Sequence, residues 1–531
     1  MTRILFRCDA SLSIGSGHVM RCFRLAKELK ARGAQIVFVC RDHPGNLFQI
    51  IEAEFILVPL PYQESFSAID DYESVSPSRE PYSAWLGGSQ VDDARRTFEL
   101  LGDHRYLDSN WIIVDHYAID HLWEKEFFAQ FASANIESPK LLVIDDLADR
   151  FHACDALLDQ NYFGDLTESR YQSLVPSSCK QFLGPHYALV GPEYAVLRKQ
   201  VRSREEISRI LLFFGGVDSQ GMTLKALEAL SMPSLSHLHV DVVIGSQNPY
   251  SKEIEQLAIR RLHTKIHRYL NTLAELVLTA DLAIGAGGSS TWERACLDLP
   301  SLVVVSAINQ LPFTQYLDAA GFVQYLGHAN DVNAQNIYES VLKLLKNSTT
   351  WRPGSELCDG YGLQRLTAFL LRDFSKLSLR QVEPSDEFVL FRWANDPSVR
   401  QYSLNENPIP LKDHHTWFLA GSEQSRRLHL IVLDSHECPL GQIRFDRFSY
   451  CPHARVSFSL DRVARGFGLS SQILKDALCC LKHYWPDIQQ VHAEIMPTNL
   501  ASKACFERVG FFEHHPSSDR LYSIFQLELS V

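Results

Sequence analysis

Short apolar runs alternate with amphipathic stretches over roughly the first 350 residues. These runs have the length of buried strands and stand at residues 4–7, 36–40, 111–114 and 141–144, then again at 210–214, 240–244, 282–284 and 302–305. Residues 19–29 carry apolar side chains at helical spacing, and Gly33 ends that helix. Short apolar strands among helices are typical of parallel α/β sheets. The repeated series predicts two tandem Rossmann-like domains, residues 1–200 and 201–374, with a cleft between them.

A different pattern follows in the last third of the chain. A helix at residues 364–371 and a polar segment at 372–378 mark the join. The elements expected beyond it are a helix at 385–395, antiparallel strands at 428–434, 440–446 and 455–460, a helix at 471–484, a strand at 491–495 and a helix at 500–509. This order predicts a third, α+β domain over residues 377–531. Residues 62–88, rich in Ser, Tyr, Pro and acidic side chains, are expected to form a long loop near the cleft.

The composition narrows the class of protein. The chain has 531 residues, and 51 basic against 63 acidic groups give a net charge of −12. The hydrophobic content of 46% and the charged content of 21% exclude a disordered chain. A net negative charge argues against nucleic acid as the partner, because binding to a phosphate backbone needs a basic face. A phosphorylated small molecule needs no more than a local basic pocket.

The N-terminal residues, the cysteines and the histidines indicate the cellular compartment and the metal content. Arg3, Arg7 and Asp9 interrupt the first apolar stretch, so we expect no signal peptide, and no stretch reaches the ~18 apolar residues that cross a bilayer. The 12 cysteines form no CxxC pair, which predicts reduced thiols in a cytoplasmic protein. The 21 histidines include no HExxH motif, and we expect no metal site.

A glycine loop after the first predicted strand carries the strongest chemical signal. Gly15 and Gly17 flank Ser16, and His18 falls in the first turn of the following helix. The amides and dipole of a helix start attract an anion, and a histidine beside it can take a proton from water or a hydroxyl group. The alternative is a histidine that caps the helix. Polar residues also follow two other strands, Asp115 with Tyr117 and Asp145 with Asp146, where ligands of parallel sheets bind.

A second glycine-rich segment lies after the predicted strand at residues 282–284. Gly287 and Gly288 allow close approach of a ligand, and Ser289 and Ser290 at a helix start suit a pyrophosphate. Glu293, one turn later, can accept hydrogen bonds from both ribose hydroxyls. The alternative is a turn with hydroxyl caps and a carboxylate that stabilises the helix dipole.

Together these segments resemble a known family. Residues 1 to about 350 are similar to the UDP-sugar hydrolase of pseudaminic acid biosynthesis and, more distantly, to the GT-B glycosyltransferase of peptidoglycan synthesis. The resemblance is carried by residues 7–10, 14–21, 114–117, 144–149, 214–218 and 286–293, with Asn309 and Gln310 after the next strand. It implies a GT-B arrangement of the two Rossmann-like domains.

The resemblance also implies roles. His18 would be the catalytic base that activates water, and attack on the anomeric carbon would release UDP with inversion. Residues implied to bind the substrate are Gly15, Gly17, Arg21, Asp115, Tyr117, Asp145, Gly287, Gly288, Ser289, Ser290, Glu293 and Asn309. Asp145 and Asp146 fit equally well as strand-end residues that accept nearby amides.

Two motifs in the third domain resemble those of the GNAT N-acetyltransferases. The first, residues 465–470, places two glycines at a helix start, where successive amides form an anion-binding nest. The second runs from Asn499 into the helix at 500–509. The alternatives are a bare helix-start turn and an ordinary N-cap. The resemblance implies acetyl-CoA as co-substrate, bound by Arg465, Gly466, Gly468, Leu469, Ser470, Asn499 and Ser502.

One departure from the GNAT pattern concerns the general acid. Phe506 stands where many relatives have a tyrosine, and phenylalanine has no proton to donate. The leaving thiolate would then be protonated by water, by another residue such as Tyr522, or not at all. His492 and Glu494, two apart on a predicted strand and therefore on one face, are candidates to receive the proton of the acceptor amine.

We therefore expect a bifunctional enzyme that hydrolyses UDP-2,4-diacetamido-2,4,6-trideoxy-β-L-altropyranose and acetylates the 4-amino group of its UDP-linked precursor. One alternative is a UDP-sugar glycosyltransferase with a hydroxyl acceptor. Another is a third domain that binds CoA or serves as a scaffold without catalysis. The partner expected is a small-molecule UDP-sugar, with neither nucleic acid nor membrane, and the oligomeric state stays open.

Overall fold

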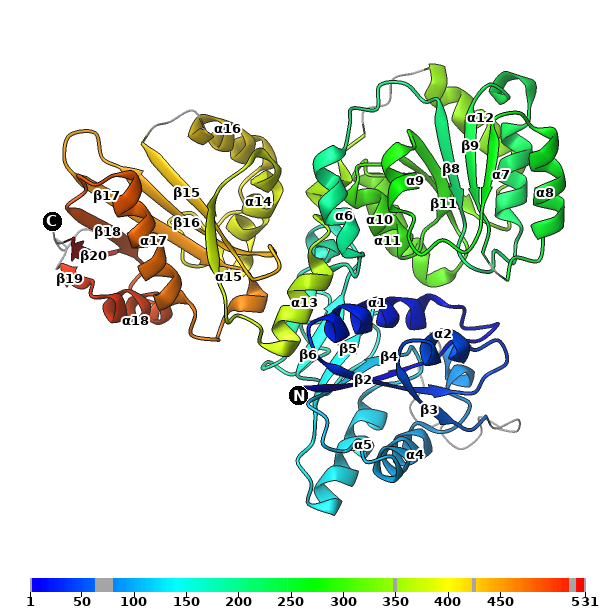
Figure 1. Ribbon diagram of the computed structural model, residues 1–531, viewed down its shortest axis with the longest axis horizontal. Coiled ribbons are helices and arrows are strands. Elements are labelled where there is room, and N and C mark those ends of the chain that lie inside the picture. Colours follow the sequence, from blue (N-terminus) through cyan, green and yellow to red (C-terminus); the bar gives the residue numbers. More distant parts are fainter. Residues whose placement is uncertain are drawn as a thin grey trace. The chain divides into compact units, whose positions relative to one another are not determined.

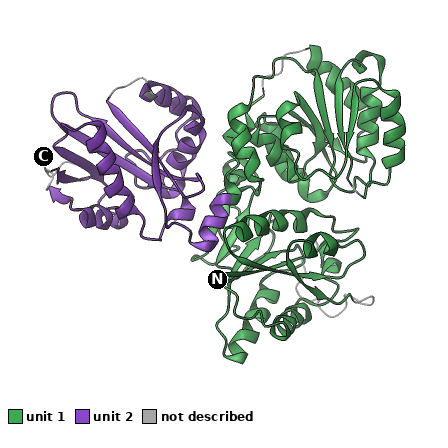
Figure 2. Cartoon of the chain, viewed as in Figure 1, with its two compact units in different colours: residues 1–363 green, residues 364–531 purple. Residues whose placement is uncertain are grey.

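The computed structural model describes residues 2–62, 80–245, 247–346, 351–422, 426–514 and 522–529. The chain divides into two compact units, residues 1–363 (unit 1) and 364–531 (unit 2), shown in green and purple in Figure 2. The division falls in the first turn of helix α13 (Gly362–Leu371). That helix, assigned from the sequence to the second domain, therefore lies mostly in unit 2, and the domain limits given above remain predictions.

The first lobe of unit 1 is built on a parallel sheet in the strand order β3-β2-β1-β4-β5-β6-β7. Its strands are β1 (Arg3–Cys8), β2 (Gln35–Arg41), β3 (Ile56–Leu60), β4 (Trp111–Asp115), β5 (Lys140–Ile144), β6 (Ala156–Asp159) and β7 (Lys180–Leu183). Its helices are α1 (Gly17–Ala31), α2 (Phe48–Glu52), α3 (Glu80–Ser83), α4 (Gln90–Asp103) and α5 (His121–Ala134). The inner strands are buried on both faces, as their unbroken apolar runs predict.

The second lobe repeats the design with the strand order β10-β9-β8-β11-β12-β13. Its strands are β8 (Arg209–Phe213), β9 (His239–Val243), β10 (Thr264–His267), β11 (Leu282–Ala286), β12 (Ser301–Val305) and β13 (Gln324–His328). Its helices are α7 (Met222–Leu230), α8 (Ser251–Arg260), α9 (Ala274–Thr279), α10 (Ser290–Cys296), α11 (Leu311–Ala319) and α12 (Ala334–Lys346). Helices α7, α8 and α12 cover one face of the sheet, and α9, α10 and α11 cover the other (Figure 1).

Helix α6 (Pro192–Leu197) precedes the second lobe in sequence but packs into its core. Tyr194 and Ala188 share a buried cluster with Val277, Trp292 and other residues of the second lobe. The chain therefore crosses from one lobe to the other before residue 200.

Unit 2 is an α+β unit around a sheet in the order β14-β15-β16-β17-β18-β20-β19. Its strands are β14 (Ser378–Gln381), β15 (Arg427–Leu433), β16 (Pro439–Arg447), β17 (His453–Leu460), β18 (Gln490–Ile495), β19 (Phe512–His514) and β20 (Ser523–Glu528). Its helices beyond α13 are α14 (Glu387–Asn395), α15 (Pro397–Arg400), α16 (Leu411–Ser422), α17 (Ser470–Tyr484) and α18 (Leu500–Val509).

Strands β17 and β18 give this sheet its distinctive feature. They are parallel, whereas the other neighbouring strands are antiparallel. Their pairing stops at Val456 and Ala493, although both strands continue. The backbone beyond those residues is left with open pairing positions between the two strands.

The predicted fold class is confirmed: two Rossmann-like lobes with parallel sheets are followed by an α+β unit. Each helix and strand expected from the sequence is present with ends within two residues of the expected ones. In the segment expected to be a loop, residues 63–79 lie outside the described part of the chain, while Glu80–Ser83 and Ala84–Leu86 form short helical turns. The sequence had not indicated β3, β6, β7, β10 or β13.

Candidate active sites

The glycine loop of the first lobe places a histidine against a strand-end carboxylate. His18 lies in the first turn of α1, and Asp115 ends the adjacent strand β4. Asp115 Oδ1 is 2.5 Å from His18 Nδ1, and both side chains are buried. Arg21, one helical turn after His18, donates to both oxygens of Asp115 at 2.6 Å and to Asp146 at 3.0 Å. Residues predicted from two separate motifs, His18 with Arg21 and Asp115, therefore meet in one array.

The hydrogen bond to Asp115 orients the imidazole of His18. Although burial opposes ionisation, Arg21 and His18 hold the pKa of Asp115 well below its usual range. An ionised Asp115 accepts the Nδ1–H of His18, which leaves Nε2 as the basic nitrogen. The guanidinium of Arg21 is bound to the carboxylates of Asp115 and Asp146. Its contact with substrate remains a prediction.

Aromatic residues surround His18. The ring of Tyr117 lies 4.5 Å from the imidazole, edge to face, and the indole of Trp85 lies 6.3 Å away. Trp85 and Tyr82 also contact Tyr117, so the turn at residues 80–86 forms part of the wall. The sequence analysis missed both aromatics, because residues 62–88 show no periodicity that would place them.

Tyr117 also links the two lobes. Asn309 of the second lobe donates from Nδ2 to the Tyr117 hydroxyl at 2.9 Å. Burial raises the pKa of Tyr117 well above its usual value, so the hydroxyl stays protonated. Ser16 lies against Gly216 of the second lobe, where an added Cβ would be 3.3 Å from its hydroxyl. The glycine loop therefore faces the second lobe across the predicted cleft.

Asp145 has a different setting from Asp115. It is fully buried at the end of β5, where Arg150 and the Tyr171 hydroxyl bind its carboxylate at 2.7 and 2.8 Å. The backbone amide of Ala148 donates to it at 3.0 Å. These contacts favour the strand-end alternative for Asp145, while Asp146 binds Arg21.

The second glycine segment begins helix α10. An added Cβ at Gly287 would lie 2.7 Å from the Thr314 hydroxyl, so the chain requires glycine there, whereas at Gly288 the space is open to 3.9 Å. Ser289 precedes the helix, and Ser290 accepts from Arg294 at 3.0 Å. Burial lowers the pKa of Arg294 to about 10, which leaves it charged at neutral pH.

Glu293 is buried and bound by two side chains from other helices. Arg24 of α1 forms an ion pair with one of its oxygens, and the Tyr194 hydroxyl donates to the other at 3.2 Å. The ion pair joins the two lobes directly. The sequence analysis missed Arg24, because nothing in its spacing from His18 indicates a partner so far along the chain.

Replacing Glu293 by alanine should weaken UDP binding by about 10- to 100-fold. A carboxylate that accepts ribose hydroxyls contributes roughly 1.5–3 kcal/mol, and calorimetric titration with UDP measures the change. Tyr194→Phe is the matched control, since it removes a hydrogen bond to Glu293 but keeps the carboxylate, and UDP affinity should change less than about threefold. Unchanged affinity in Glu293→Ala would assign the carboxylate to holding Arg24 and Tyr194 alone.

In unit 2, the predicted nest is open to a ligand. Gly466 and Gly468 have φ of +87° and +76°, and an added Cβ at either would meet nothing within 4 Å. Leu469 and Ser470 continue directly into α17, a helix of 15 residues whose first amides point toward the same opening. These positions, with the separated strands β17 and β18, fit a cofactor that carries a diphosphate and an extended arm.

The other residues predicted to bind acetyl-CoA are held by the protein itself. Arg465 donates to the Leu460 carbonyl at 2.8 Å and to Asp396 at 2.9 Å. Arg465 and its neighbour Arg462 hold the pKa of Asp396 at about 2. Asn499 caps α18 by accepting from the amide of Ser502 at 3.1 Å, as the alternative for that motif predicted.

The structure places three of the residues considered for acid–base catalysis in unit 2. Phe506 is buried and packs edge to face on Phe511, 4.9 Å between ring centroids, so it belongs to the core. His492 and Glu494 share one face of β18, as predicted. Arg455 lies 3.4 Å from Glu494. Tyr522 lies just before β20, and its protonating role remains a prediction.

His429 on β15 makes the stability of unit 2 dependent on pH. Burial lowers its pKa to about 4, against a hydrogen bond that His429 Nε2 donates to Gln442 Oε1 at 2.9 Å and that favours the charged form. In the unfolded chain the pKa of a histidine is near 6.5. The contribution of His429 to the free energy of unfolding is therefore fully present above pH 6.5 and is lost as the pH falls toward 4, because the unfolded chain binds the proton more tightly. Between pH 7 and 4.5 we expect a loss of roughly 2 kcal/mol from this group.

Urea unfolding of the full chain at the two pH values measures that loss. His429→Gln keeps a polar partner for Gln442 but cannot titrate, so its unfolding free energy should fall by about 2 kcal/mol less than that of the wild type. Equal falls in both proteins would show that His429 is not the group responsible.

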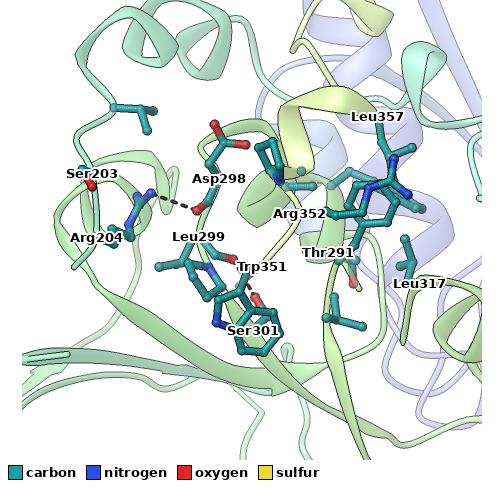
Figure 3. Close-up of a pocket in the computed structure, with 18 of the residues that line it drawn as sticks. Ser203, Arg204, Thr291, Asp298, Leu299, Ser301, Leu317, Trp351, Arg352 and Leu357 are labelled. Atoms are coloured by element: carbon teal, nitrogen blue, oxygen red, sulfur yellow. Dashed lines mark hydrogen bonds between the residues drawn. The ribbon is translucent and has the colours of Figure 1, made fainter. Parts of the chain in front are cut away.

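A cavity of about 430 Å³ in unit 1 is lined by Thr291 and Trp292 of α10 but by none of the predicted site residues (Figure 3). Arg204, Asp298 and Leu299 line it before β8 and β12, and Trp351 and Arg352 close another side. Arg204 donates to the carbonyls of Ala280 and Asp298, so its guanidinium is held by backbone oxygens of the protein. The cavity opens at the amino ends of the strands, whereas His18 and Asp115 lie at the carboxyl ends.

The described residues also bear on the expected metal and membrane content. Within the described ranges, no three His, Cys, Asp or Glu side chains gather in a group suited to a metal ion. The helices that the structure describes include none with the length and apolar character needed to cross a membrane. All 12 cysteines are free thiols, and nine of them are buried.

Comparisons with known proteins agree with the two-part organisation. Residues 376–512 match the acetyltransferase (GNAT) domain family. The chain is 26% identical over 326 residues to the UDP-2,4-diacetamido-2,4,6-trideoxy-beta-L-altropyranose hydrolase of Campylobacter jejuni, covering 61% of this chain and 99% of that protein. It is 22% identical over 530 residues to the uncharacterized protein MJ1062 of Methanocaldococcus jannaschii, covering 96% of each. Among solved structures, MurG of Acinetobacter baumannii is similar over 70% of this chain and all of that chain, with 11% identity and a TM-score of 0.46.

The matches to the hydrolase and to the GNAT family confirm those two resemblances inferred from the sequence. The chain is homologous to the UDP-sugar hydrolase, and its C-terminal part contains a GNAT domain, for which acetyl-CoA is the co-substrate. The similarity to the M. jannaschii protein extends over nearly the whole of both chains, so the combination of the two parts is not unique to this protein.

Proposed function

We propose that the chain carries two enzyme activities, hydrolysis of a UDP-linked sugar in unit 1 and acetyl-CoA-dependent N-acetylation in unit 2. The substrate that we propose for unit 1 is that of the C. jejuni relative, UDP-2,4-diacetamido-2,4,6-trideoxy-β-L-altropyranose. The products would be UDP and the free sugar. The acetyl acceptor that we propose for unit 2 is the 4-amino group of the UDP-linked precursor of that substrate.

The observation that carries the hydrolase proposal is the buried array of His18, Asp115 and Arg21. An imidazole whose Nδ1–H is held by an ionised carboxylate has a free basic Nε2, which is what a general base needs. His18 takes a proton from water while the water oxygen bonds to the anomeric carbon. The bond between that carbon and the UDP oxygen breaks, UDP leaves with the electron pair, and the configuration inverts.

The second lobe supplies the proposed UDP site. Gly288 leaves room beside the start of α10, and Ser289 and Ser290 offer hydroxyls there. Glu293, fixed by Arg24 and Tyr194, would accept the ribose hydroxyls. The Arg24–Glu293 ion pair and the Asn309–Tyr117 hydrogen bond both join the two lobes. Binding of UDP in the second lobe would therefore be coupled to binding of the sugar beside His18 in the first.

In unit 2, the glycines at positions 466 and 468 and the amides at the start of α17 would hold the diphosphate of acetyl-CoA. The free backbone positions between β17 and β18 would receive the extended arm. Acetyl-CoA supplies an activated acetyl thioester. Glu494 and His492, on the face beside those strands, would take the proton that the amine loses on acetylation.

The proposal is tested by incubating the full chain with the UDP-linked diacetamido sugar in water, without a sugar acceptor and without acetyl-CoA. Free sugar and UDP in equal amounts, identified by NMR and mass, are expected. A requirement for an added hydroxyl acceptor would favour a glycosyltransferase with the same UDP site. No reaction of the diacetamido sugar under either condition would overturn the hydrolase assignment.

A further inference from the structure

One face of the sheet in unit 2 carries an unusual concentration of arginine. Arg427 on β15, Arg444 on β16 and Arg455 on β17 surround a single carboxylate, Asp446, at 2.9, 2.9 and 3.8 Å. The strand register places Asp446 opposite both Arg427 and Arg455, so these side chains point to the same side of the sheet. We call these three arginines the arginine face.

The arginine face is held in place by an aromatic side chain. Trp417 of α16 lies with its ring centroid 5.0 Å from the Arg427 guanidinium and 5.2 Å from that of Arg444. Contacts of this kind orient a guanidinium without neutralising it. The side chains of Arg427 and Arg444 keep 15% and 21% of their area exposed, and that of Arg455 keeps 40%. The three cations are therefore ordered but remain accessible.

At close range the arginines outnumber the carboxylates. Two carboxylates lie within ion-pair distance of the three guanidinium groups: Asp446, and Glu494 at 3.4 Å from Arg455. His429 and His492, on the same side of the sheet, add no charge at neutral pH, because burial lowers the pKa of both. Burial also lowers the pKa of Arg444, so an incoming anion would relieve the cost of keeping its charge.

The arginine face adjoins the place where acetyl transfer is proposed. Glu494 and Arg455 stand at the point where β17 and β18 stop pairing, and Asp446 lies on the next strand. At about 4.8 Å per strand, β16 is roughly 5–10 Å from the opening between β17 and β18. An acceptor that spans this distance has its amine at the opening and an anionic group beyond it.

We propose that the arginine face binds the diphosphate of a nucleotide-linked amino sugar, and so selects the UDP-linked form as acetyl acceptor over the free sugar. This inference rests on the proposed acetyltransferase activity and adds its acceptor site. Planar guanidinium groups bind phosphate oxygens in pairs, which accounts for arginine rather than lysine at all three positions.

The test compares acetylation of the UDP-linked 4-amino sugar with that of the same amino sugar freed of UDP, using the full chain and acetyl-CoA. The wild type should use the UDP-linked amine with a kcat/KM at least about tenfold higher. Arg444→Gln should raise the KM for that amine at least about tenfold, while its kcat and the KM for acetyl-CoA change less than about threefold. Arg455→Gln, the more exposed position, should act in the same direction.

Arg447→Gln is the matched control. Arg447 lies on the same strand and is also paired with a carboxylate, Asp487, but its register partner is the buried Ala454, so it belongs to the opposite side of the sheet. The KM of the Arg447→Gln variant for the UDP-linked amine should stay at the wild-type value. Melting temperatures of all variants separate loss of fold from loss of binding.

Binding of UDP provides a readout that does not depend on turnover. Calorimetric titration of the wild type should give two equivalents of UDP, one in unit 1 and one on the arginine face, and Arg444→Gln should retain one. A single equivalent in both proteins, or equal acetylation of free and UDP-linked amines, would overturn this inference while leaving the acetyltransferase in place. No acetylation of either amine would overturn the acetyltransferase as well.

Discussion

Replacing His18 by alanine should lower kcat for hydrolysis of the UDP-linked diacetamido sugar by about 10²–10⁴-fold, the usual contribution of a general base. KM should change little, because the groups proposed to bind UDP lie in the second lobe and are not altered. Steady-state release of UDP measures both constants. The effect should be confined to hydrolysis, and acetylation of the precursor should proceed at the wild-type rate.

Asp115 should share in this effect without contacting the reacting atoms. Asp115→Asn keeps the shape of the side chain but removes the ionised acceptor that holds the His18 Nδ1–H, so kcat should fall at least about tenfold with KM maintained. His104→Ala, at the exposed end of α4, is the matched control and should leave both constants unchanged. Activity of His18→Ala within a few-fold of the wild type would rule out the base assignment.

Replacing Gly468 by valine should abolish acetyl transfer and leave hydrolysis unaffected. The backbone at Gly468 has φ of +76°, and no protein atom lies within 4 Å of an added Cβ, which is the space that we propose for the diphosphate of acetyl-CoA. A branched side chain there strains the backbone and fills that space. Acetyl-CoA binding by calorimetry should disappear, and release of UDP from the diacetamido sugar should continue at the normal rate.

Gly510→Val distinguishes blocked binding from general strain. Gly510 also has positive φ, +102°, but it ends α18 and lies elsewhere in unit 2. It should lower the melting temperature to a similar extent while acetyl-CoA still binds. Retention of acetyl-CoA binding in a folded Gly468→Val protein would contradict the proposed nest.

Much of the fold could be predicted because its central strands are buried on both faces. Runs such as residues 111–114 and 302–305 are unbroken and apolar, and the structure places both in the interior of a parallel sheet. Strand β13 could not be recognised, since all five of its residues are half-buried and show neither a run nor an alternation. Strands β6 and β7, at four residues each, are too short to show a period.

Some residues of the candidate sites could likewise be predicted from the sequence, and others could not. The glycine loop with His18 and the strand-end Asp115 were predictable, because the carboxyl edge of a parallel sheet brings strand ends together. Partners that approach from another part of the chain were not. Arg24 reaches Glu293 across the two lobes, and Asp396 holds Arg465 from a loop 69 residues away. Such pairs depend on how the elements pack, which local sequence patterns do not record.

The central claim is that one chain acetylates a UDP-linked amino sugar and then hydrolyses the product. The most direct test supplies the full chain with the UDP-linked 4-amino precursor and acetyl-CoA, without any sugar acceptor, and follows the mixture by NMR. The N-acetylated UDP-sugar should appear first, followed by free diacetamido sugar and UDP, and omission of acetyl-CoA should prevent formation of the free diacetamido sugar. Accumulation of the acetylated UDP-sugar without its hydrolysis, or failure to acetylate the precursor at all, would contradict it.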